Sequence, residues 1–510
     1  MTRLDRSALS AVVLLGLFLR LKDIATNPPE LFEDEISGAM SAWSTVTTGH
    51  DVVVDHFPLF TTLLGPQLPI YGLLTVPFQA VLGHTALAVR LPAVLLGVAA
   101  IVLLYGFVHA VAGRALALTA AAVVAVLPWA VHFGRVGWDN ASYPPLLLGG
   151  LLVLLRGLAP GQVGRPGPPP RRWLYAAAAL LGLTAYTYQI ALVMTPLFVL
   201  PVLWVRRAEL VRYSRRDLGA AAALGVLIVA PYLWTWSGVP DFRSRAEEIS
   251  TFASGVNAAT LERFTANYLA NLSPTFLFVS GDDNLRHGTG RGELLLWMLP
   301  FAILGVAWSI VHARRSALAF VAIAWLVLAP LPAALTDDGV PHAARSMLEL
   351  LAWPMLVAIG LDLAWPDRLR RRQLLPALAV AALAVFLAAI ATETIAYYRY
   401  VFTAYPARSA DAWRSGTAAI MREVGARTPP GGRACIDTLD RFTFPHVVRW
   451  YLGDAPAFSI VEGDGGRCTT PGDIVALSAD HDPPPRSVEV ATVSDRAGDV
   501  VARIWRRDTP

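Results

Sequence analysis

Long, uninterrupted apolar blocks constrain the fold of this chain more than any other feature of its sequence. In hydrocarbon, a segment must satisfy its backbone hydrogen bonds internally, and these blocks are too long and too uniformly apolar for the alternating strands of a barrel. We therefore predict an all-α polytopic membrane protein with about 11 transmembrane helices. The blocks lie near residues 7 to 22, 86 to 108, 115 to 133, 143 to 158, 173 to 187, 189 to 205, 217 to 236, 293 to 311, 316 to 335, 344 to 363 and 374 to 394.

The composition agrees with a membrane protein. Of the 510 residues, 55% are hydrophobic and only 16% are charged, and the mean hydropathy is +0.50. The net charge of +4 could suggest a nucleic-acid partner, but the arginines lie in short loops between the apolar blocks, so we expect no such partner. The first apolar run has no small-residue cleavage site before the acidic loop that follows, and we interpret it as a retained span.

The basic residues between the blocks indicate how the chain crosses the membrane. If the N-terminus is cytoplasmic, nearly every short cytoplasmic loop is basic, as the positive-inside rule requires. The region from 173 to 205 could be one long tilted span or two short ones, and the arginine count favours two. The predicted topology is N-in and C-out. High alanine, arginine, glycine and proline usage fits a GC-rich bacterial genome, and we expect a location in the bacterial plasma (inner) membrane. The cytoplasmic set is Arg3, Arg6, Arg156, Arg165, Arg171, Arg172, Arg206, Arg207, Arg212, Arg215, Arg216, Arg314, Arg315, Arg368, Arg370, Arg371 and Arg372.

The C-terminal part of the chain is more polar and indicates a second domain. We predict a transmembrane domain over residues 1–395, with outer loops 23–85 and 237–292, and a small extracytoplasmic α/β domain over residues 396–510. Strands are expected at "RACIDTL", "AFSIVEG", "DIVALSA", "VEVATVS" and "DVVARIW", with a helix around "FPHVVRWYLG". Cys435 and Cys468 lie in this region, where an extracellular location favours a disulfide over two free thiols.

Four segments carry a resemblance to a known family. They are "FEDEISGAMSAW", "GPQLPIYGLLTVPFQAVLG", "RLPAVLLG" and "HFGRVGWDNASYPPLLL". Together with the odd span count and the long acidic first outer loop, they resemble the GT-C glycosyltransferases. The resemblance is to the branch of protein O-mannosyltransferases and aminoarabinose transferases, and it covers most of residues 10 to 360. It implies a transmembrane catalytic domain and a lipid-phosphate sugar donor.

An acidic pair in the first outer loop is the leading catalytic candidate. Ile36, Met40 and Trp43 would share one face of a helix along the membrane surface, which places Asp34 and Glu35 in its N-terminal turn. The alternative is that Asp34 is only an N-cap and Glu35 a favourable first-turn charge. By resemblance, Asp34 is the general base toward the acceptor hydroxyl, and Glu35 orients the site or contacts the substrate.

Transfer from a polyprenyl phosphate also needs cations for the departing phosphate. Arg345 and His342 precede the tenth span on the outer face, Arg286 and His287 lie in the loop before the eighth, and Arg135 is a weaker candidate beside the third. The alternatives are an interfacial arginine that reaches toward water and a solvated loop rich in asparagine and glycine.

Two further residues are candidates for contact with the sugar. Asp139 in "GWDNAS" could hydrogen-bond a sugar or position the base, and its alternative is a helix cap. Tyr188 in "YTYQ" could stack on or hydrogen-bond a sugar, and its alternative is an interfacial aromatic belt.

Oxygen-rich pairs on the outer face raise the question of a metal. Asp34 with Glu35, Asp282 with Asp283, and Asp337 with Asp338 would suit Mg, Mn or Ca. Because the mannosyltransferase branch works without a metal, the resemblance implies no obligatory metal cofactor, with a divalent cation as the alternative.

These features lead to one functional hypothesis and two rivals. We expect an inverting glycosyltransferase that moves a sugar from a polyprenyl-phosphate donor to a glycan, lipid or protein acceptor at the outer face of the membrane. A lipid or glycan transporter or flippase would place charged residues in mid-span and pair broken helices in matching halves. A glycan polymerase or ligase of the same fold is the rival within enzymes.

Overall fold

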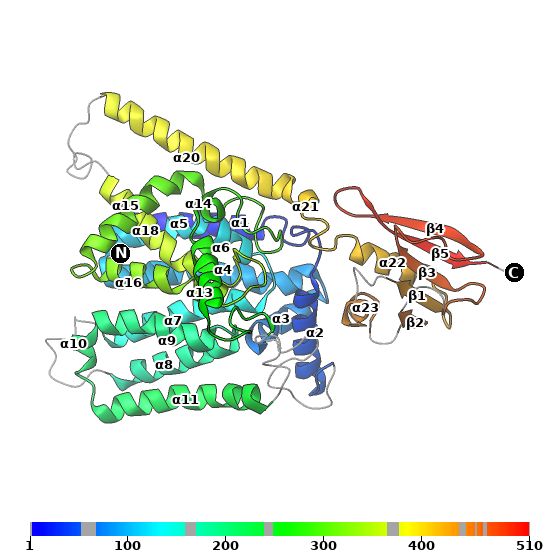
Figure 1. Ribbon diagram of the computed structural model, residues 1–510, viewed down its shortest axis with the longest axis horizontal. Coiled ribbons are helices and arrows are strands. Elements are labelled where there is room, and N and C mark those ends of the chain that lie inside the picture. The colour runs from blue at the N-terminus through cyan, green and yellow to red at the C-terminus, as the bar shows by residue number, and fades with distance from the viewer. Residues whose placement is uncertain are drawn as a thin grey trace. The chain divides into compact units, whose positions relative to one another are not determined.

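The chain is described by a computed structural model that covers residues 3–52, 68–158, 170–238, 248–364, 377–437, 445–453, 456–462 and 467–508 (Figure 1). It forms two compact units that are discontinuous in sequence. We call Met1–Lys22, Gly65–Tyr71 and Leu91–Tyr397 the helical unit, and Asp23–Leu64, Gly72–Arg90 and Tyr398–Pro510 the α/β unit. The α/β unit thus combines most of the first predicted outer loop with the C-terminal region. The sequence, in contrast, predicts a single domain boundary at residue 396. Arg165, Arg368, Arg370, Arg371 and Arg372, assigned above to cytoplasmic loops, lie outside the described residues.

Each of the 11 apolar blocks coincides with helical structure, and the region from 173 to 205 is two helices joined through a short turn. The helices over these blocks up to residue 238, with the short helices between them, are α1 (Arg3–Leu21), α4 (Ala86–Ala112), α5 (Arg114–Val126), α6 (Pro128–Phe133), η1 (Asp139–Ser142), α7 (Tyr143–Gly157), α8 (Arg171–Leu183), η3 (Thr184–Tyr186), α9 (Ala191–Val205), α10 (Arg207–Leu210) and α11 (Arg215–Gly238). The helices that follow in the chain, up to the end of the last block, are α13 (Ala258–Asn271), α14 (Pro274–Phe278), η4 (Leu296–Met298), α15 (Leu299–His312), α16 (Ala317–Leu328), α17 (Leu331–Ala334), α18 (Glu349–Ala364) and α20 (Ala377–Thr403).

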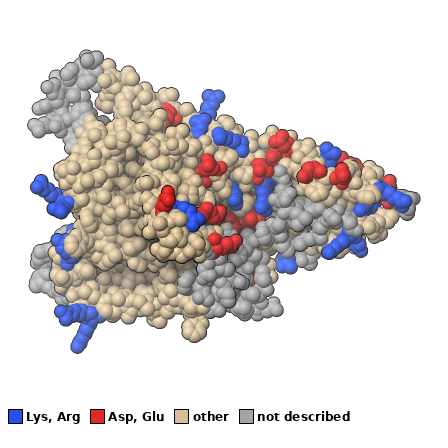
Figure 2. Space-filling view, viewed as in Figure 1, with Lys and Arg blue, Asp and Glu red and all other residues tan. Residues whose placement is uncertain are grey.

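The apolar helices and the fold indicate a multi-pass membrane protein. Among the described residues, four helical segments are long and apolar enough to span a bilayer: Ala86–Ala112, Arg215–Thr235, Ala317–Ala334 and Val380–Thr403. Figure 2 shows broad areas of the helical unit without charged side chains, and basic side chains along its margin at the left of the view. The number of spans and their orientation stay predictions.

Arginine side chains stabilise helix ends inside the helical unit. The break between α5 and α6, at Pro128, leaves carbonyls without helical partners. Buried Arg20 of α1 donates to the carbonyls of Val124, Ala125 and Ala130 at 3.2 to 3.3 Å. Arg20 therefore satisfies the backbone at this break.

Glycines allow α15 and α18 to pack at close range. A Cβ at Gly305 would collide with the carbonyl oxygen of Leu356, and a Cβ at Gly360 would collide with that of Phe301. Helices in membranes associate closely where such small residues let their backbones approach. The contact of α15 with α18 therefore requires glycine at both positions.

The α/β unit contains a sheet of mixed direction with the strand order β2-β1-β3-β5-β4. β1 pairs parallel with β2 and β3, and β5 pairs antiparallel with β3 and β4. The five predicted strands and the predicted helix, α23, are all present. The elements of the unit are α2 (Glu33–Thr48), α3 (Pro69–Leu82), α21 (Tyr405–Arg408), α22 (Thr417–Arg427), β1 (Arg433–Asp437), α23 (Pro445–Leu452), β2 (Ser459–Glu462), β3 (Ile474–Ser478), β4 (Ser487–Ser494) and β5 (Val500–Arg507).

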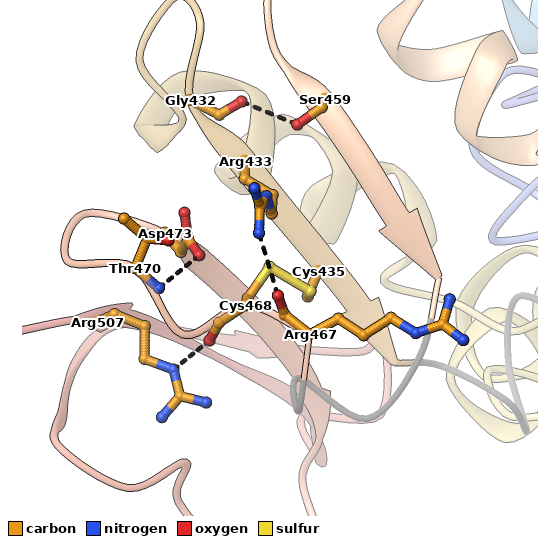
Figure 3. Close-up of a disulfide and its surroundings, with 9 residues drawn as sticks. All are labelled: Gly432, Arg433, Cys435, Ser459, Arg467, Cys468, Thr470, Asp473 and Arg507. Carbon is orange, nitrogen blue, oxygen red and sulfur yellow. Dashed lines mark hydrogen bonds between the residues drawn. A yellow bond between two sulfur atoms is a disulfide. The ribbon is translucent and has the colours of Figure 1, made fainter.

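A disulfide joins Cys435 of β1 to Cys468, with a Cα–Cα distance of 5.9 Å (Figure 3). Both cysteines are fully buried, and the Arg507 guanidinium donates to the Cys468 carbonyl at 2.6 Å. The bridge is the alternative that the sequence favoured. It connects the segment before β3 to the neighbouring strand β1.

The apolar face of α2 belongs to the core of the α/β unit. Ile36 and Met40 are buried in one cluster with Ile420 of α22 and Val447 of α23. The helix predicted along the membrane surface is therefore present, but this face packs on protein instead of lipid.

We predict opposite effects for two glycine substitutions in the helical unit. Gly305→Ala should lower the free energy of unfolding by about 1–3 kcal/mol, because the added methyl group forces α15 away from α18. Gly149→Ala, on α7 with no heavy atom within 4 Å of the added Cβ, should stabilise by up to about 1 kcal/mol. Thermal unfolding of the purified protein in detergent measures both, and equal effects of the two substitutions would contradict the packing described.

Candidate functional site

The first turn of α2 gathers three carboxylates. Phe32 is the N-cap residue, and its N–H donates to the Glu35 carboxylate at 3.0 Å. Glu33, Asp34 and Glu35 occupy the first turn, where the helix dipole favours negative charge. Asp34 is exposed, whereas Glu35 is buried. The predicted N-terminal position of Asp34 is confirmed, but the capping residue precedes the acidic run.

Glu35 forms a fully buried ion pair with Arg90 of α4. The guanidinium donates through Nε to Oε1 and through Nη2 to Oε2, each at 2.9 Å. Its Nη1 also donates to the carbonyls of Ile24 and Pro28, at 3.3 and 2.7 Å. A bidentate, charge-assisted pair of this kind fixes orientation as well as distance. Arg90 therefore holds the segment that leads into α2 and the first turn of α2 itself.

Glu30 and Glu33 of the acidic loop also have defined partners. Glu30 accepts from the Tyr451 hydroxyl at 3.0 Å and from the Ala418 N–H at 3.3 Å. Burial raises the pKa of Glu30, and these two hydrogen bonds and the charge of Arg90 oppose that increase. Glu33 pairs with Arg414 at 2.7 Å. In this loop, Glu30, Glu33 and Glu35 thus contribute to the architecture of the α/β unit, and Asp34 is the exposed carboxylate.

A second group of polar side chains lies in the helical unit. His287 Nδ1 is 3.2 Å from Asp282 Oδ2, and His342 Nδ1 is 4.0 Å from the same oxygen. The two imidazole rings are stacked with centroids 4.4 Å apart, and the Trp138 ring meets His287 edge-on at 5.6 Å. Asp282, His287 and His342 each offer a ligand atom within 4.8 Å of the others. We call these three residues the His–Asp cluster.

Local hydrogen bonds hold the members of the His–Asp cluster in place. Asp282 accepts from the Ala343 N–H through Oδ2 and from the Asn284 N–H through Oδ1, both at 2.8 Å. Asn271, fully buried, accepts from the His342 N–H at 2.9 Å. Burial, together with the neighbouring His287 and Arg345, lowers the pKa of His342 well below its ordinary value. The imidazole of His342 is therefore neutral at physiological pH.

The two predicted phosphate-binding arginines lie close in sequence to the histidines of this cluster. The Arg286 guanidinium donates to the Asn284 side-chain oxygen at 3.2 Å. The backbone carbonyl oxygen of Arg286 lies 2.7 Å from a ring nitrogen of His132. The Arg345 guanidinium donates to the Asp338 carboxylate at 2.9 Å and to the Thr336 hydroxyl at 2.8 Å. Both arginines are thus held by their own loops. Phosphate contact by either one stays a prediction.

The remaining candidates have individual surroundings. Arg135 is buried and donates to the carbonyls of Leu19 and Arg20 at 2.9 and 3.0 Å, close to the C-terminus of α1. Asp139 begins η1 and accepts from the Asn140 N–H at 2.7 Å. Tyr188 lies in the turn before α9, where burial raises its pKa to about 12; Arg345 opposes this shift and Asp139 adds to it. Their roles in substrate binding stay predictions.

The candidates thus form two groups in different units. Asp34 and Glu35 belong to the α/β unit, and the other candidates belong to the helical unit. Sequence reasoning missed Arg90, although a lone arginine within the predicted span from 86 to 108 signals a buried ion-pair partner. The sequence pattern indicates Asp282 only as one of an acidic pair, because its proximity to His342 depends on a contact between distant segments.

Comparisons with known proteins show which family and folds this chain resembles. The model of the dolichyl-phosphate-mannose-protein mannosyltransferase family matches residues 66–236. No curated protein sequence matches the chain.

Solved structures resemble nearly the whole chain. ArnT from Cupriavidus metallidurans, bound to undecaprenyl phosphate, has a TM-score of 0.60 and 14% identity over 98% of this chain and 97% of that one. The archaeal oligosaccharyltransferase AglB from Archaeoglobus fulgidus, in complex with an inhibitory peptide and a dolichol-phosphate, has a TM-score of 0.55 and 13% identity over 90% of this chain. That match covers 64% of AglB. The matched family and these structures belong to the GT-C superfamily, which confirms the resemblance drawn from the sequence.

Breaking the buried ion pair should destabilise the α/β unit. Arg90→Ala leaves the Glu35 carboxylate buried without its cation, and we expect a loss of about 3–5 kcal/mol in the free energy of unfolding. Arg114→Ala removes a pair with Asp5 in which the arginine side chain is 49% exposed, so less than about 1 kcal/mol should be lost. Thermal unfolding compares the two variants, and a loss for Arg90→Ala no greater than for the control would refute the role given to the pair.

The buried His446 of α23 should make the stability of the α/β unit depend on pH. Burial lowers the pKa of His446 from 6.5 to about 4; a hydrogen bond to the Glu33 backbone opposes this, and Arg449 adds to it. Between pH 4 and 6.5 the imidazole of His446 is protonated in the unfolded chain but neutral in the folded one. The contribution of the neutral, buried His446 to the free energy of unfolding is therefore fully present above pH 6.5 and is lost as pH falls through about 4.

The expected result is that thermal stability falls between pH 7 and pH 4.5, and that it falls less in His446→Gln than in wild type. His481→Gln, at an exposed position, is the matched control and should follow wild type. Parallel declines in all three proteins would show that His446 does not titrate as described.

Proposed function

We propose that this GT-C protein is an inverting glycosyltransferase that transfers a sugar from a polyprenyl-phosphate donor to an acceptor at the outer face of a bacterial plasma membrane. Asp34 is the general base. The acceptor is a glycan, lipid or protein.

The matched family and the similar structures indicate a GT-C glycosyltransferase that uses polyprenyl-phosphate-linked donors. The family name refers to a dolichyl-phosphate sugar, and the two solved structures hold undecaprenyl phosphate and a dolichol-phosphate. These lipids share a phosphate attached to a long isoprenoid chain. Support for a donor of this class therefore comes from two kinds of comparison.

The position of Asp34 is the observation that carries the proposal. Its carboxylate is exposed at the first turn of a helix whose opposite face is buried and whose adjacent Glu35 is fixed by Arg90. A general base must be held in place and must still be reachable by the nucleophile. Asp34 meets both conditions, and the neighbouring Glu35 acts as its positioning residue.

The proposed reaction needs one base and no general acid. The acceptor hydroxyl attacks the anomeric carbon from the face opposite the phosphate, and its proton passes to Asp34. The bond between the anomeric carbon and the phosphate oxygen breaks at the same time, and the polyprenyl phosphate leaves with the bonding electrons. A phosphate is a weak base, so it departs without protonation, and cations that stabilise its charge suffice. We assign Arg286 and Arg345 to this role. The reaction written in this way includes no metal.

The proposed orientation rests on the distribution of charge. With the N-terminus in the cytoplasm, the loops rich in arginine face inward. The acidic loop, the His–Asp cluster and the C-terminal sheet then belong to segments outside the membrane. Polyprenyl-phosphate sugars are the donors suited to that compartment, because nucleotide sugars are scarce there.

Replacing the proposed base tests the function directly. In membranes supplied with radiolabelled polyprenyl-phosphate sugars, Asp34→Asn should reduce transfer to the acceptor fraction by about 100-fold to 10,000-fold. Asp482→Asn, the same substitution at an exposed aspartate of the α/β unit, is the matched control and should retain most of the activity.

The outcomes separate the competing functions. Transfer that is unchanged in Asp34→Asn would remove the mechanism. Absence of transfer by wild type from any donor would favour a transporter, and transfer only of preassembled glycans would favour a polymerase or ligase.

A further inference from the structure

We propose that Asp282, His287 and His342 form a binding site for one divalent transition-metal ion, with Zn²⁺ as the best match to the donor set. The site goes beyond the proposed transfer reaction, in which no metal takes part. It differs also from the acidic pairs considered from the sequence, because two of its three donors are imidazoles.

The distances between the donor atoms suit a metal centre. A tetrahedral zinc ion with bonds of about 2.0–2.2 Å holds its ligand atoms about 3.4 Å from one another. The Nδ1 atoms of His287 and His342 lie 3.2 and 4.0 Å from Asp282 Oδ2, and all donors fall within 4.8 Å. His342 Nδ1 also accepts from the Arg345 N–H at 3.4 Å, and its ring is stacked on that of His287. The site therefore closes when the His342 ring turns out of the stack and moves Nδ1 away from this N–H.

The carboxylate is already oriented by groups outside the donor set. Metal sites depend on such outer hydrogen bonds to fix the ligands. The N–H groups of Ala343 and Asn284 hold the two oxygens of Asp282, and the side chain of Asn271 holds the backbone of His342. Because Asp282 and Asn271 are buried, these hydrogen bonds are shielded from competition with water.

The chemistry of the donors selects the metal. Two imidazoles and one carboxylate favour zinc and related transition metals over Mg²⁺ or Ca²⁺, which prefer oxygen ligands. Three protein ligands also leave a fourth position of the tetrahedron open to water or to an anionic oxygen. His287, whose side chain is 16% exposed, provides the side from which such a ligand can enter.

The location of the site indicates what the ion would do for the protein. Asp282 and His287 lie in the loop after α14, and His342 lies in the loop before α18. A bound ion would join these two loops, which also carry Arg286 and Arg345. It would therefore reduce the freedom of both arginines without taking part in proton transfer.

Zinc binding by the purified full-length protein tests the site. Protein in detergent is stripped of metal with a chelator and titrated with Zn²⁺ against a fluorescent zinc indicator. Wild type should bind one equivalent that excess Mg²⁺ does not displace. The double variant His287→Ala/His342→Ala should bind at least about 100-fold more weakly. His312→Ala, which removes a partly buried histidine outside the cluster, is the matched control and should bind as wild type.

A second measurement covers the case in which the double variant does not fold. Zinc should raise the thermal midpoint of wild type and of His312→Ala, but not that of the single variant Asp282→Asn. Wild type that binds no zinc, or variants that bind and respond like wild type, would show that the three residues form only a hydrogen-bonded cluster. Because these readouts do not involve sugar transfer, their result is independent of the role of Asp34.

Discussion

The buried pair of Arg90 and Glu35 is the interaction on which the proposed catalytic segment depends. Two opposite charges inside a protein are stable only when each is paired and hydrogen-bonded, and removing one partner leaves a costly isolated charge. Here the guanidinium donates through Nε and Nη2 to Glu35 and through Nη1 to the backbone of the preceding segment. One residue therefore fixes the path of the chain into α2 and the orientation of its first turn.

This arrangement explains why one loop contains so many carboxylates. Glu30 is bound to Tyr451, Glu33 to Arg414 and Glu35 to Arg90, so three of the four acidic side chains connect distant parts of the α/β unit. Asp34 is carried on the same turn and is exposed. The structural carboxylates thus hold the helix terminus in place, and the proposed base projects from it.

Much of the architecture could be predicted because its signals are local. Hydropathy located the apolar helices apart from α3, which lies within the predicted first outer loop. The arginine count favoured two helices between 173 and 205, and alternation located every strand of the C-terminal sheet. The site was predicted less completely. Asp34 was placed correctly at a helix start, but Arg90 was missed, since pairing between residues 55 positions apart has no local pattern. The grouping of His342 with Asp282 likewise required two loops to meet.

The sequence alone determined that this chain forms apolar helices suited to a membrane, the strands of a small α/β domain and an acidic helix start. Backbone hydrogen bonding in lipid and side-chain alternation in strands depend on neighbouring residues, and both are visible in sequence. Only the tertiary structure decided which carboxylates are buried and which one is exposed. It also joined the first outer loop to the C-terminal region, through contacts such as that of Glu30 with Tyr451, 421 positions away. Burial and pairing depend on segments that fold together, and a linear pattern of residues does not specify those partners.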